Sequence, residues 1–522
     1  MNFIFDLILN FIHDVFAMTE LETLSAENMR LKSEVDRMGK ELEYLKETMR
    51  ALQRAHFGNK SERFETEEQG ILFNEAEVLS LEPDTGDDEN SDSTIEVRSH
   101  SKARGHRKPL PEQLDREIIK IELPEAERFA EDGTPLKIIG YELSEKLKYE
   151  PAKISVIEYH RAKYGVDSGD YVKMANPIPS IVPKSIATPE LIAAIVVAKY
   201  ADGLPLYRTE EILTRQGVQI PRSTMARWMI KAALASQPLV NVLNDRLTSG
   251  DYAACDETRV QVLNEKGRKA ETDSWMIVRA TPYGPKKIVL FDYNISRAGR
   301  VMKDLFLDFK GYLQVDGLNC YDALAEKEGI IRVGCNMHAR RKFEEAKVTG
   351  AKEGKTLAEV GLKFYKTIYA VEKELKEKTV DERYRLRIEK TAELWRDFKA
   401  WAIEQKDKVP KKSKIGEALF YFMDDYELLT AYLKDGRLEP DNGFTERAIR
   451  KFAIGRNNWL FSDSVDGANA SSVLYSLVVT AKINGVNPYR ALVQIFTELP
   501  KAQTLADIEA LADILLTPKP TQ

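Results

Sequence analysis

The chain has 522 residues, too many for one compact core, and its length predicts about three or four domains. A composition of 43% hydrophobic and 31% charged residues is typical of a globular protein, and the net charge of −6 excludes a globally basic nucleic-acid-binding protein. Three cysteines are too few for a disulfide framework and indicate a reducing, cytoplasmic location.

Residues 1–18 are an apolar extension of uncertain status. Asp6 and Asp14 interrupt the apolar residues and no basic flank precedes them, so we expect neither a signal peptide nor a membrane span. A short amphipathic segment and a start codon placed too far upstream both remain open.

Residues 19–58 show a heptad pattern with alternating spacings of three and four. The positions are Leu21, Leu24, Asn28, Leu31, Val35, Met38, Leu42, Leu45, Met49 and Leu52. A single Asn at an a position commonly fixes the register of a coiled coil. The pattern therefore predicts self-association, with an amphipathic helix packed on its own chain as the alternative.

Residues 59–111 are predicted to be a charged, disordered linker. Between Glu65 and Val97 it holds twelve acidic and no basic residues, and Arg98 to Lys108 is then basic. Residues 112–182 predict a small β-rich module, with strands in IIKIEL and ISVIEYHRAKY.

Residues 185–245 have the layout of a helix-turn-helix. Gly217 makes the turn, and Pro221-Arg222-Ser223 opens the second helix with Ser223 or Thr224 as its cap. Arg222 and Arg227 would then face outward where a recognition helix meets DNA. Plain helix packing is the alternative.

Residues 248–345 predict three antiparallel strands, a helix, a strand ending at Asp316, a helix, a fifth strand and a helix that begins near Met337. This is the order of an RNase H-like sheet, in which the first and fourth strands are neighbours. Asp256 on the first strand and Asp316 after the fourth would then lie together. Carboxylates that close usually share a divalent cation.

Phosphodiester chemistry uses two such ions, about 4 Å apart, and needs a third carboxylate to hold both. Glu446, in DNGFTERAIRKFAIGRNNWLF, is the candidate, and Mg²⁺ is the expected ion with Mn²⁺ as a substitute. A turn or cap role for either aspartate and an ion pair between Glu446 and Arg450 remain alternatives. Glu257 is expected on the opposite face from Asp256.

The sequence resembles the large transposase of the insertion sequence sixty-six family over nearly the whole chain from Leu21. The stretches that carry the resemblance are RAHFGNKSERF, KPLPEQL, YRTEEIL, STMARW, DETRVQVL, LQVDGLNCYDAL, CNMHARRKF, DNGFTERAIRKFAIGRNNWLFSDS and ANASSVLYSLVVTAKINGVNPY. It implies catalysis by two aspartates and a glutamate, which fall on Asp256, Asp316 and Glu446.

The resemblance also implies an insertion before Glu446, and residues 346–438 independently read as all-α. The expected fold class is multidomain α/β: a coiled coil, a small β-rich module, a helix-turn-helix and an RNase H-like core. The core comprises residues 248–345 and 439–486 around the insertion, and 487–522 is a C-terminal tail. Family members commonly carry a cysteine-rich zinc module before the helix-turn-helix, but residues 112–182 contain no cysteine, so we expect no zinc there.

Basic residues near the acids are candidates for DNA contacts. They are His338, Arg340, Arg341, Lys342, Arg447, Arg450, Lys451 and Arg456. Cys335 and His338 have metal-ligand spacing, but two ligands do not make a structural site.

The expected function is Mg²⁺-dependent cleavage at the ends of a DNA element and transfer of the 3′ hydroxyl into target DNA. The expected partners are DNA, a second copy of the chain and small accessory proteins of the same element. A structure-specific nuclease and a catalytically inactive DNA-binding regulator are the alternatives.

Overall fold

The computed structural model describes residues 27, 29–32, 34–35, 38, 118, 154–165, 172–325, 328–347 and 356–518. The predictions for residues 1–18, most of the heptad pattern, the linker and the IIKIEL strand lie outside the described residues. The chain divides into two units, residues 64–160 and the rest, and the sheet and helices below all belong to the second of these. No described helix has the length and apolar composition that a bilayer crossing requires.

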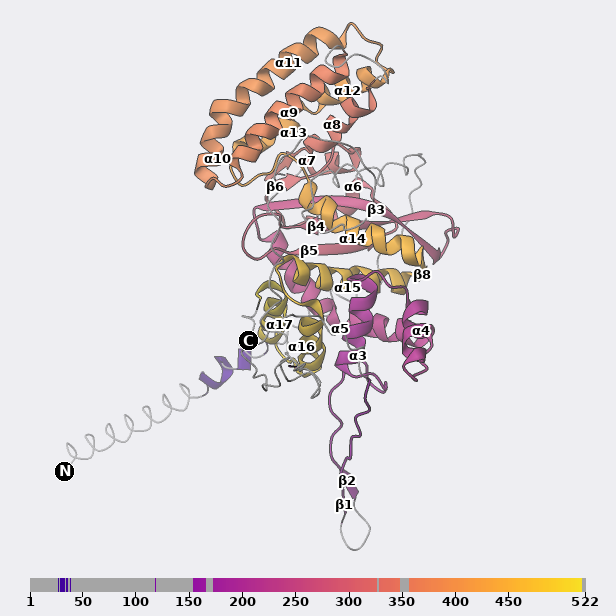
Figure 1. The fold of residues 1–522 in the computed structure, drawn as a ribbon. Helices are drawn as coiled ribbons and strands as arrows, with labels where there is room; N and C mark the ends of the chain where they lie inside the picture. Colours follow the sequence, from indigo (N-terminus) through magenta and orange to yellow (C-terminus); the bar gives the residue numbers. More distant parts are fainter. Residues whose placement is uncertain are drawn as a thin grey trace, which may run out of the picture. The chain divides into compact units, whose positions relative to one another are not determined.

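A mixed six-stranded sheet forms the centre of the described chain (Figure 1). Its strands are β3 (Tyr252–Asn264), β4 (Asp273–Ala280), β5 (Val289–Asn294), β6 (Gly311–Gln314), β7 (Ile330–Val333) and β8 (Ser462–Ser464). The order is β5-β4-β3-β6-β7, with β8 paired to the far end of β3. Strands β3, β4 and β5 are antiparallel, whereas β6 and β7 run parallel to β3. The first and fourth strands of the predicted order are therefore neighbours, as expected.

Two helices that follow late in the chain cover this sheet (Figure 1). Helix α14 (Gly443–Trp459) packs on β3 and β4, and α15 (Val465–Ile483) packs on β5. The Ser476 hydroxyl accepts the Phe291 N–H at 2.8 Å, and the Thr480 hydroxyl donates to the Val289 carbonyl at 2.9 Å. Helix α15 thus satisfies backbone groups along the outer strand, which would otherwise be an unpaired sheet edge.

Helices from both ends of the described chain form a second layer below the sheet (Figure 1). They are α3 (Pro189–Tyr200), α4 (Leu206–Arg215), α5 (Arg222–Thr248), α16 (Pro488–Glu498) and α17 (Leu505–Leu516). Helix α16 packs on α3, and α17 packs on α5. The sequence indicated only a tail for residues 487–522, but the described part, residues 487–518, contributes buried residues such as Leu492 and Leu515 to the main core.

The turn between α4 and α5 contains Gly217 at φ +85°, a left-handed conformation that favours glycine, as the sequence predicted. The predicted caps of α5 are wrong. The helix begins at Arg222 with Pro221 as its N-cap and no side-chain cap bond, which places Ser223 and Thr224 inside its first turn.

Short elements connect the strands. Helix α6 (Gly299–Leu305) follows β5, the 3₁₀ turn Asn319–Tyr321 and α7 (Asp322–Ala325) follow β6, and α8 (Asn336–Glu345) follows β7. Helix α6 begins only at Gly299, after a turn in which the Ser296 hydroxyl accepts the Ala298 N–H.

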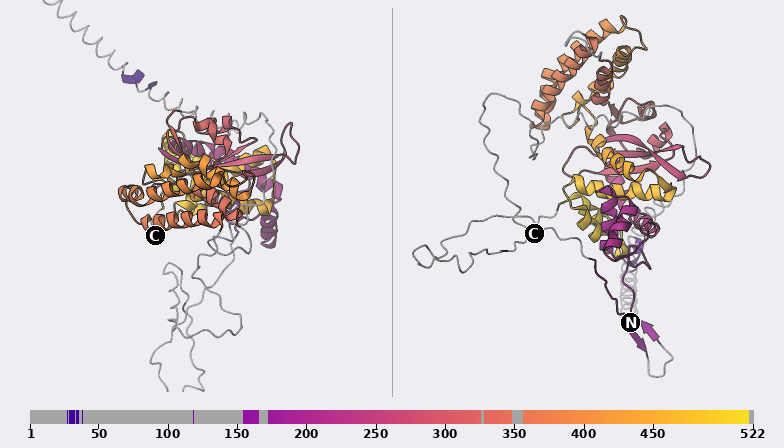
Figure 2. Two further views of the ribbon diagram at one scale, coloured as in Figure 1. Left: turned by 90° about the horizontal axis from the view of Figure 1, so that it is seen from above. Right: turned by 45° about the vertical axis from the view of Figure 1, so that its right-hand side comes forward.

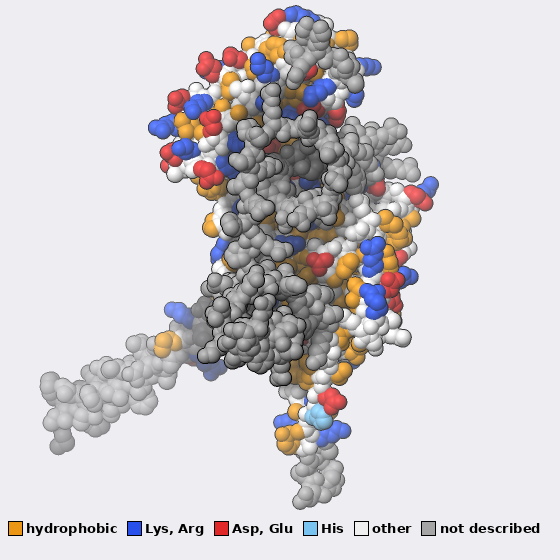
Figure 3. All heavy atoms as spheres, in the orientation of Figure 1, with side chains coloured by type: hydrophobic (Ala, Val, Ile, Leu, Met, Phe, Trp, Pro, Cys, Tyr) orange, Lys and Arg blue, Asp and Glu red, His pale blue; other side chains and the backbone are white. Residues whose placement is uncertain are grey.

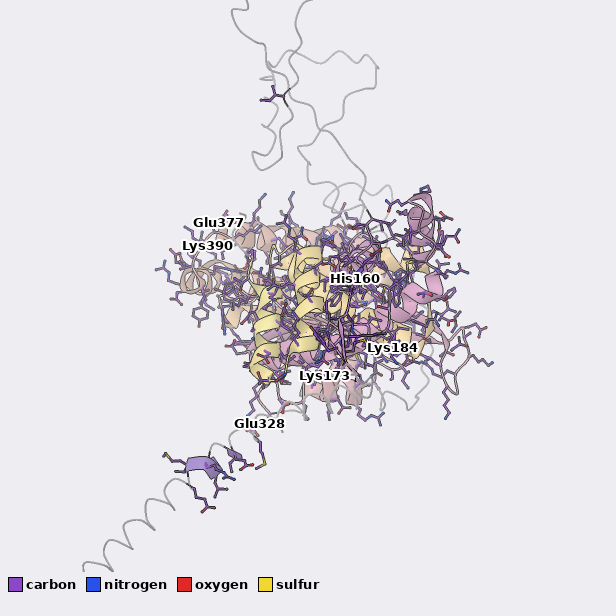
Figure 4. All side chains as sticks on the ribbon, turned by 90° about the horizontal axis from the view of Figure 1, so that it is seen from below. His160, Lys173, Lys184, Glu328, Glu377 and Lys390 are labelled. Atoms are coloured by element: carbon purple, nitrogen blue, oxygen red, sulfur yellow. The ribbon has the colours of Figure 1, made fainter. Side chains whose placement is uncertain are left out.

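The insertion is helical throughout its described part (Figure 2). Its elements are α9 (Leu357–Leu375), α10 (Val380–Leu386), the π-helical turn Arg387–Thr391, α11 (Ala392–Lys406), α12 (Lys414–Asp424), α13 (Tyr426–Thr430) and the 3₁₀ turn Ala431–Lys434. The rings of Phe398 and Phe422 stack at 4.1 Å in a second, aromatic core, which also includes Tyr252 of β3 and Val333 of β7. Charges of both signs are interspersed over its surface (Figure 3), and Glu377 and Lys390 lie at one edge (Figure 4).

The predicted strand ISVIEYHRAKY is largely wrong. Only Lys163–Gly165 is a strand (β1), paired with β2 (Val172–Met174), and residues 154–162 have no regular structure. No partner strand lies beside residues 154–162 in the described chain, and a strand needs such a partner for its backbone hydrogen bonds. The Arg161 guanidinium closes the hairpin by donating to the Ala175 carbonyl at 2.8 Å.

Candidate active site

The sheet places Asp256 and Asp316 side by side. In the parallel pair β3–β6, Ala254 lies opposite Gln314. Continuing this register by two residues brings Asp256 opposite Asp316, and in a parallel pair such residues point to the same face. The two aspartates thus reach one face from segments far apart in the sequence.

Asp256 carries an unbalanced charge. Burial raises the pKa of its carboxyl well above the usual range, and the neighbouring carboxylates of Glu257, Asp316 and Glu446 raise it further. Its hydrogen bond in the structure is to the adjacent Glu257 N–H at 2.8 Å. Among the described residues, no lysine or arginine forms an ion pair with it. Such a carboxyl favours its neutral form, and a cation bound beside it would favour the ionised form.

Asp316 lies in the loop after β6, where its carboxylate accepts the Leu318 N–H at 3.0 Å. Burial raises the pKa of this carboxyl too, although His338 and more distant arginines lower it. The insertion contacts this loop directly. A Cβ on Gly317 would lie 2.5 Å from the Tyr421 hydroxyl of α12, so only glycine lets the two segments approach this closely.

Glu446 lies in the first turn of α14, facing the sheet, with 13% of its side chain exposed. Asn442, just before the helix, fixes this turn. Its side-chain amide donates to the Cys255 carbonyl at 2.9 Å, and its N–H donates to the Cys335 sulfur at 3.2 Å. The start of α14 is thereby held next to Asp256. The sequence allowed an ion pair between Glu446 and Arg450 as an alternative role for Glu446. Among the described residues, these two side chains do not form one.

The Glu446 carboxylate also faces Cys335 and His338. The Cys335 thiol donates to its Oε1 at 3.6 Å, and His338 Nδ1 lies 3.8 Å from the same oxygen. Cys335, His338 and Glu446 each offer one possible metal-ligand atom, and these three atoms all lie within 4.8 Å of one another. Among the described residues, Asp256 and Asp316 are not part of such a group. Asp316 and Glu446 therefore lie near enough to Asp256 to raise its pKa, but among the described residues the three predicted acids do not form one compact group of ligands.

Glu257 belongs to this region as well, which the sequence analysis did not expect. Its side chain is 1% exposed and pairs with Arg297 at 2.9 Å, while the Tyr321 hydroxyl donates to it at 2.5 Å. Burial raises its pKa, and the charge of Asp316 raises it further. Strand alternation could place Glu257 on the other face of β3, but no local pattern indicates Arg297 and Tyr321 as its partners.

Some of the candidate DNA-contacting side chains already interact with other residues of the chain. Arg340 pairs with Glu344 at 3.1 Å, and Lys342 lies over the Tyr421 ring at 4.9 Å. Burial lowers the pKa of Arg341, and the nearby negative charge of Glu446 offsets part of this lowering. Arg456 donates to the Thr258 hydroxyl and to the Arg259 carbonyl, and so attaches α14 to β3.

Other candidates are open to solvent. Arg447 and Lys451 are exposed, and Arg450 is half-buried on α14. Arg222 and Arg227 are exposed at the start of α5, with Arg227 donating to the Thr224 hydroxyl at 3.2 Å. These five side chains lie on helices that the core holds in place.

Three family profiles match the chain. The profile described as "Transposase IS66 family" matches residues 184–470, and "IS66 C-terminal element" matches residues 476–512. A third profile, "Transposase C of IS166 homeodomain", matches residues 44–119.

Two proteins of Sinorhizobium fredii (strain NBRC 101917 / NGR234) are similar over nearly their full length. The uncharacterized protein y4qI is 32% identical over 94% of this chain and 92% of its own length. The uncharacterized protein y4jD is 29% identical over 92% of this chain and 96% of its own.

Proposed function

We propose, from the premise that the chain belongs to the IS66 transposase family, that it cuts DNA at the ends of its element and joins each freed 3′ hydroxyl to target DNA. The observation that carries this proposal is the cluster of Asp256, Asp316 and Glu446. Their carboxylates come from three segments, the charges of Asp316 and Glu446 both act on Asp256, and no described lysine or arginine forms an ion pair with these acids. The strand order supports an RNase H-like core for residues 248–345 and 439–486.

The side chains fit divalent metal ions. Carboxylate oxygens are the ligands that Mg²⁺ prefers. Burial raises the pKa of Asp256 and of Asp316, and a bound cation would favour the ionised form of both carboxyls. Asp256 and Asp316 would hold the ions, and Glu446 would complete one site by turning from Cys335 and His338. When bound, two such ions activate the attacking oxygen and stabilise the leaving oxygen.

The chain's own residues position the DNA. Arg447 and Lys451 on α14, and Arg341 and Lys342 on α8, would contact phosphates on both sides of the acids. His338, with 28% of its side chain exposed, would hydrogen-bond a phosphate or water. These groups act by holding the reacting atoms in place and by neutralising charge.

Two further regions would select and pair the DNA ends. The exposed Arg222 and Arg227 at the start of α5 suit contacts of a helix-turn-helix with an element end. Leu31, Val35 and Met38 lie on a helix and are 52–61% exposed, as a coiled-coil surface is before a second copy covers it. We expect DNA and a second copy of the chain as partners, and accessory proteins of the element remain a prediction.

The test incubates the full chain with Mg²⁺ and DNA that bears candidate ends. We expect joined products from the wild type and from Glu417→Gln, a control at an exposed ion pair of α12. Asp256→Asn, Asp316→Asn and Glu446→Gln should each reduce joining by at least about 10³-fold while DNA binding persists. Cuts without joining would support a nuclease instead, and binding alone a regulator.

A further inference from the structure

Cys335, His338 and Glu446 form a compact group with mixed sulfur, nitrogen and oxygen ligands. Cys335 precedes α8, His338 lies in its first turn, and Glu446 lies in the first turn of α14. Their ligand atoms all lie within 4.8 Å of one another. The sequence indicated only Cys335 and His338 as a pair, and the fold supplies the third ligand.

The spacing suits tetrahedral coordination. Zinc–sulfur bonds of about 2.3 Å and zinc–nitrogen or zinc–oxygen bonds of about 2.0–2.1 Å at tetrahedral angles place ligand atoms roughly 3.3–3.6 Å apart. The Cys335 sulfur lies 3.6 Å from Glu446 Oε1, and His338 Nδ1 lies 3.8 Å from it. These two separations lie within a few tenths of an ångström of that range, and the Cys335 sulfur and the His338 nitrogen lie within 4.8 Å of each other, so modest side-chain shifts would bring the three ligands to one ion.

The surroundings of the sulfur and of the imidazole also suit a metal ion. The Cys335 sulfur accepts the backbone N–H of Asn442 at 3.2 Å and that of His338. Burial and the charges of Glu446 and Asp441 nevertheless raise the pKa of the Cys335 thiol well above its usual range, so a thiolate here needs a bound cation as its counter-charge. His338 Nδ1 is buried and has no hydrogen-bond partner among the described residues. A buried nitrogen without a partner is costly, and a metal ion would give it one. The exposed part of His338 leaves a way in for the ion.

We propose that Cys335, His338 and Glu446 bind a thiophilic divalent cation of the Zn²⁺ class, at a site that shares Glu446 with the catalytic acids. A thiolate and an imidazole favour Zn²⁺ over Mg²⁺, which prefers oxygen ligands and octahedral geometry. Three protein ligands leave a fourth position for water, and coordination by Cys335 releases its proton to solvent.

The shared glutamate has a functional consequence, which rests on the proposed function. A Glu446 carboxylate bound to zinc beside Cys335 is not available to the Mg²⁺ ions at Asp256 and Asp316. Zinc is therefore expected to inhibit DNA joining in Mg²⁺ by holding Glu446 away from them.

Cobalt provides a direct probe of the site, because Co²⁺ replaces Zn²⁺ and absorbs light when a thiolate binds it. We expect one equivalent of Co²⁺ to give the full chain a thiolate-to-cobalt charge-transfer band, which Zn²⁺ then removes. Cys335→Ser should abolish the band. Cys320→Ser and Asp316→Asn should keep it, because they remove a different thiol and a different acid. Absence of the band in the wild type, or its persistence in Cys335→Ser, would overturn the proposal.

His338→Gln covers the case in which Cys335→Ser does not fold, since His338 is partly exposed and Cys335 is buried. We expect this variant to lose at least about tenfold in zinc affinity, measured by competition with a chromophoric chelator. Wild-type affinity in the folded His338→Gln protein would contradict the proposal.

The joining assay separates the two proposals. A chain that shows the cobalt band but joins no DNA in Mg²⁺ supports the zinc site and contradicts the transposase mechanism. A chain that joins DNA but shows no band contradicts the zinc site alone. A chain that joins DNA equally well with zinc bound at Cys335 contradicts the sharing of Glu446.

Discussion

Glu257 and Asp256 are neighbours on strand β3, but their side chains have different charge partners. Glu257 is buried against Arg297 and the Tyr321 hydroxyl, so the chain itself supplies a positive charge and a hydrogen-bond donor. Asp256, one residue earlier, faces the carboxylates of Asp316 and Glu446 and is not paired with a described lysine or arginine. Because a buried charge must be offset, the first arrangement is complete within the chain, and the second is the one for which we propose a cation from outside the chain.

The largest expected effect is a difference in DNA-joining activity between variants of Asp256 and of Glu257. Asp256→Asn should reduce DNA joining by at least about 10³-fold, because it removes a proposed metal ligand. Glu257→Gln keeps an acceptor for Tyr321 and should stay within about tenfold of the wild type, as expected for a residue that only supports the site. The measurement is the initial rate of joining at saturating Mg²⁺. Equal losses in both variants would show that the two sides of β3 do not differ in function.

The next effect is on stability. Arg297→Gln should lower the free energy of unfolding by about 1–2 kcal/mol near neutral pH, because it leaves the buried Glu257 carboxylate with Tyr321 alone. We place the loss at the low end because 34% of the Arg297 side chain is exposed. The measurement is urea unfolding, with the exposed Arg300→Gln as a matched control.

The loss in Arg297→Gln should also depend on pH. The pKa of Glu257 is already raised by burial and by Asp316, and removal of Arg297 raises it further. The destabilisation is thus present where Glu257 is ionised and disappears at acid pH, where it is protonated. A loss that is independent of pH would mean that Arg297 acts through its packing on the Trp275 ring, 4.1 Å away, and not through its charge.

The sequence could predict the sheet because its signals are local. Alternating apolar residues and turns indicated β3 to β7 in the right order, and the pairing of β3 with β6 placed Asp256 beside Asp316. Strand β8 has only three residues and no apolar alternation, so it gave no such signal. The contacts of Glu446 with Cys335 and His338 depend on how α14 meets α8, which no pattern within either helix specifies.

The smallest expected effect tests whether an unbalanced buried charge by itself marks a functional site. Burial lowers the pKa of Lys199 on α3 to about 8, and among the described residues it has no acidic ion-pair partner. Its ammonium lies 5.0 Å from the Trp459 ring centre, outside the acidic cluster. The folded state therefore disfavours the charged form. This penalty is fully present below about pH 8 and fades as the pH rises toward 10.5, the ordinary pKa of a lysine.

Lys199→Met should accordingly stabilise the protein by up to about 1 kcal/mol near neutral pH, with a gain that disappears at high pH and no change in DNA joining. Thermal unfolding between pH 7 and pH 10 measures the gain, and Lys231→Met on α5 is the control, because Lys231 is exposed and should show no such trend. A loss of joining in Lys199→Met would mean that the unbalanced charge at Lys199 also serves the reaction. Charge imbalance would then no longer distinguish the acidic side of β3 from the rest of the molecule.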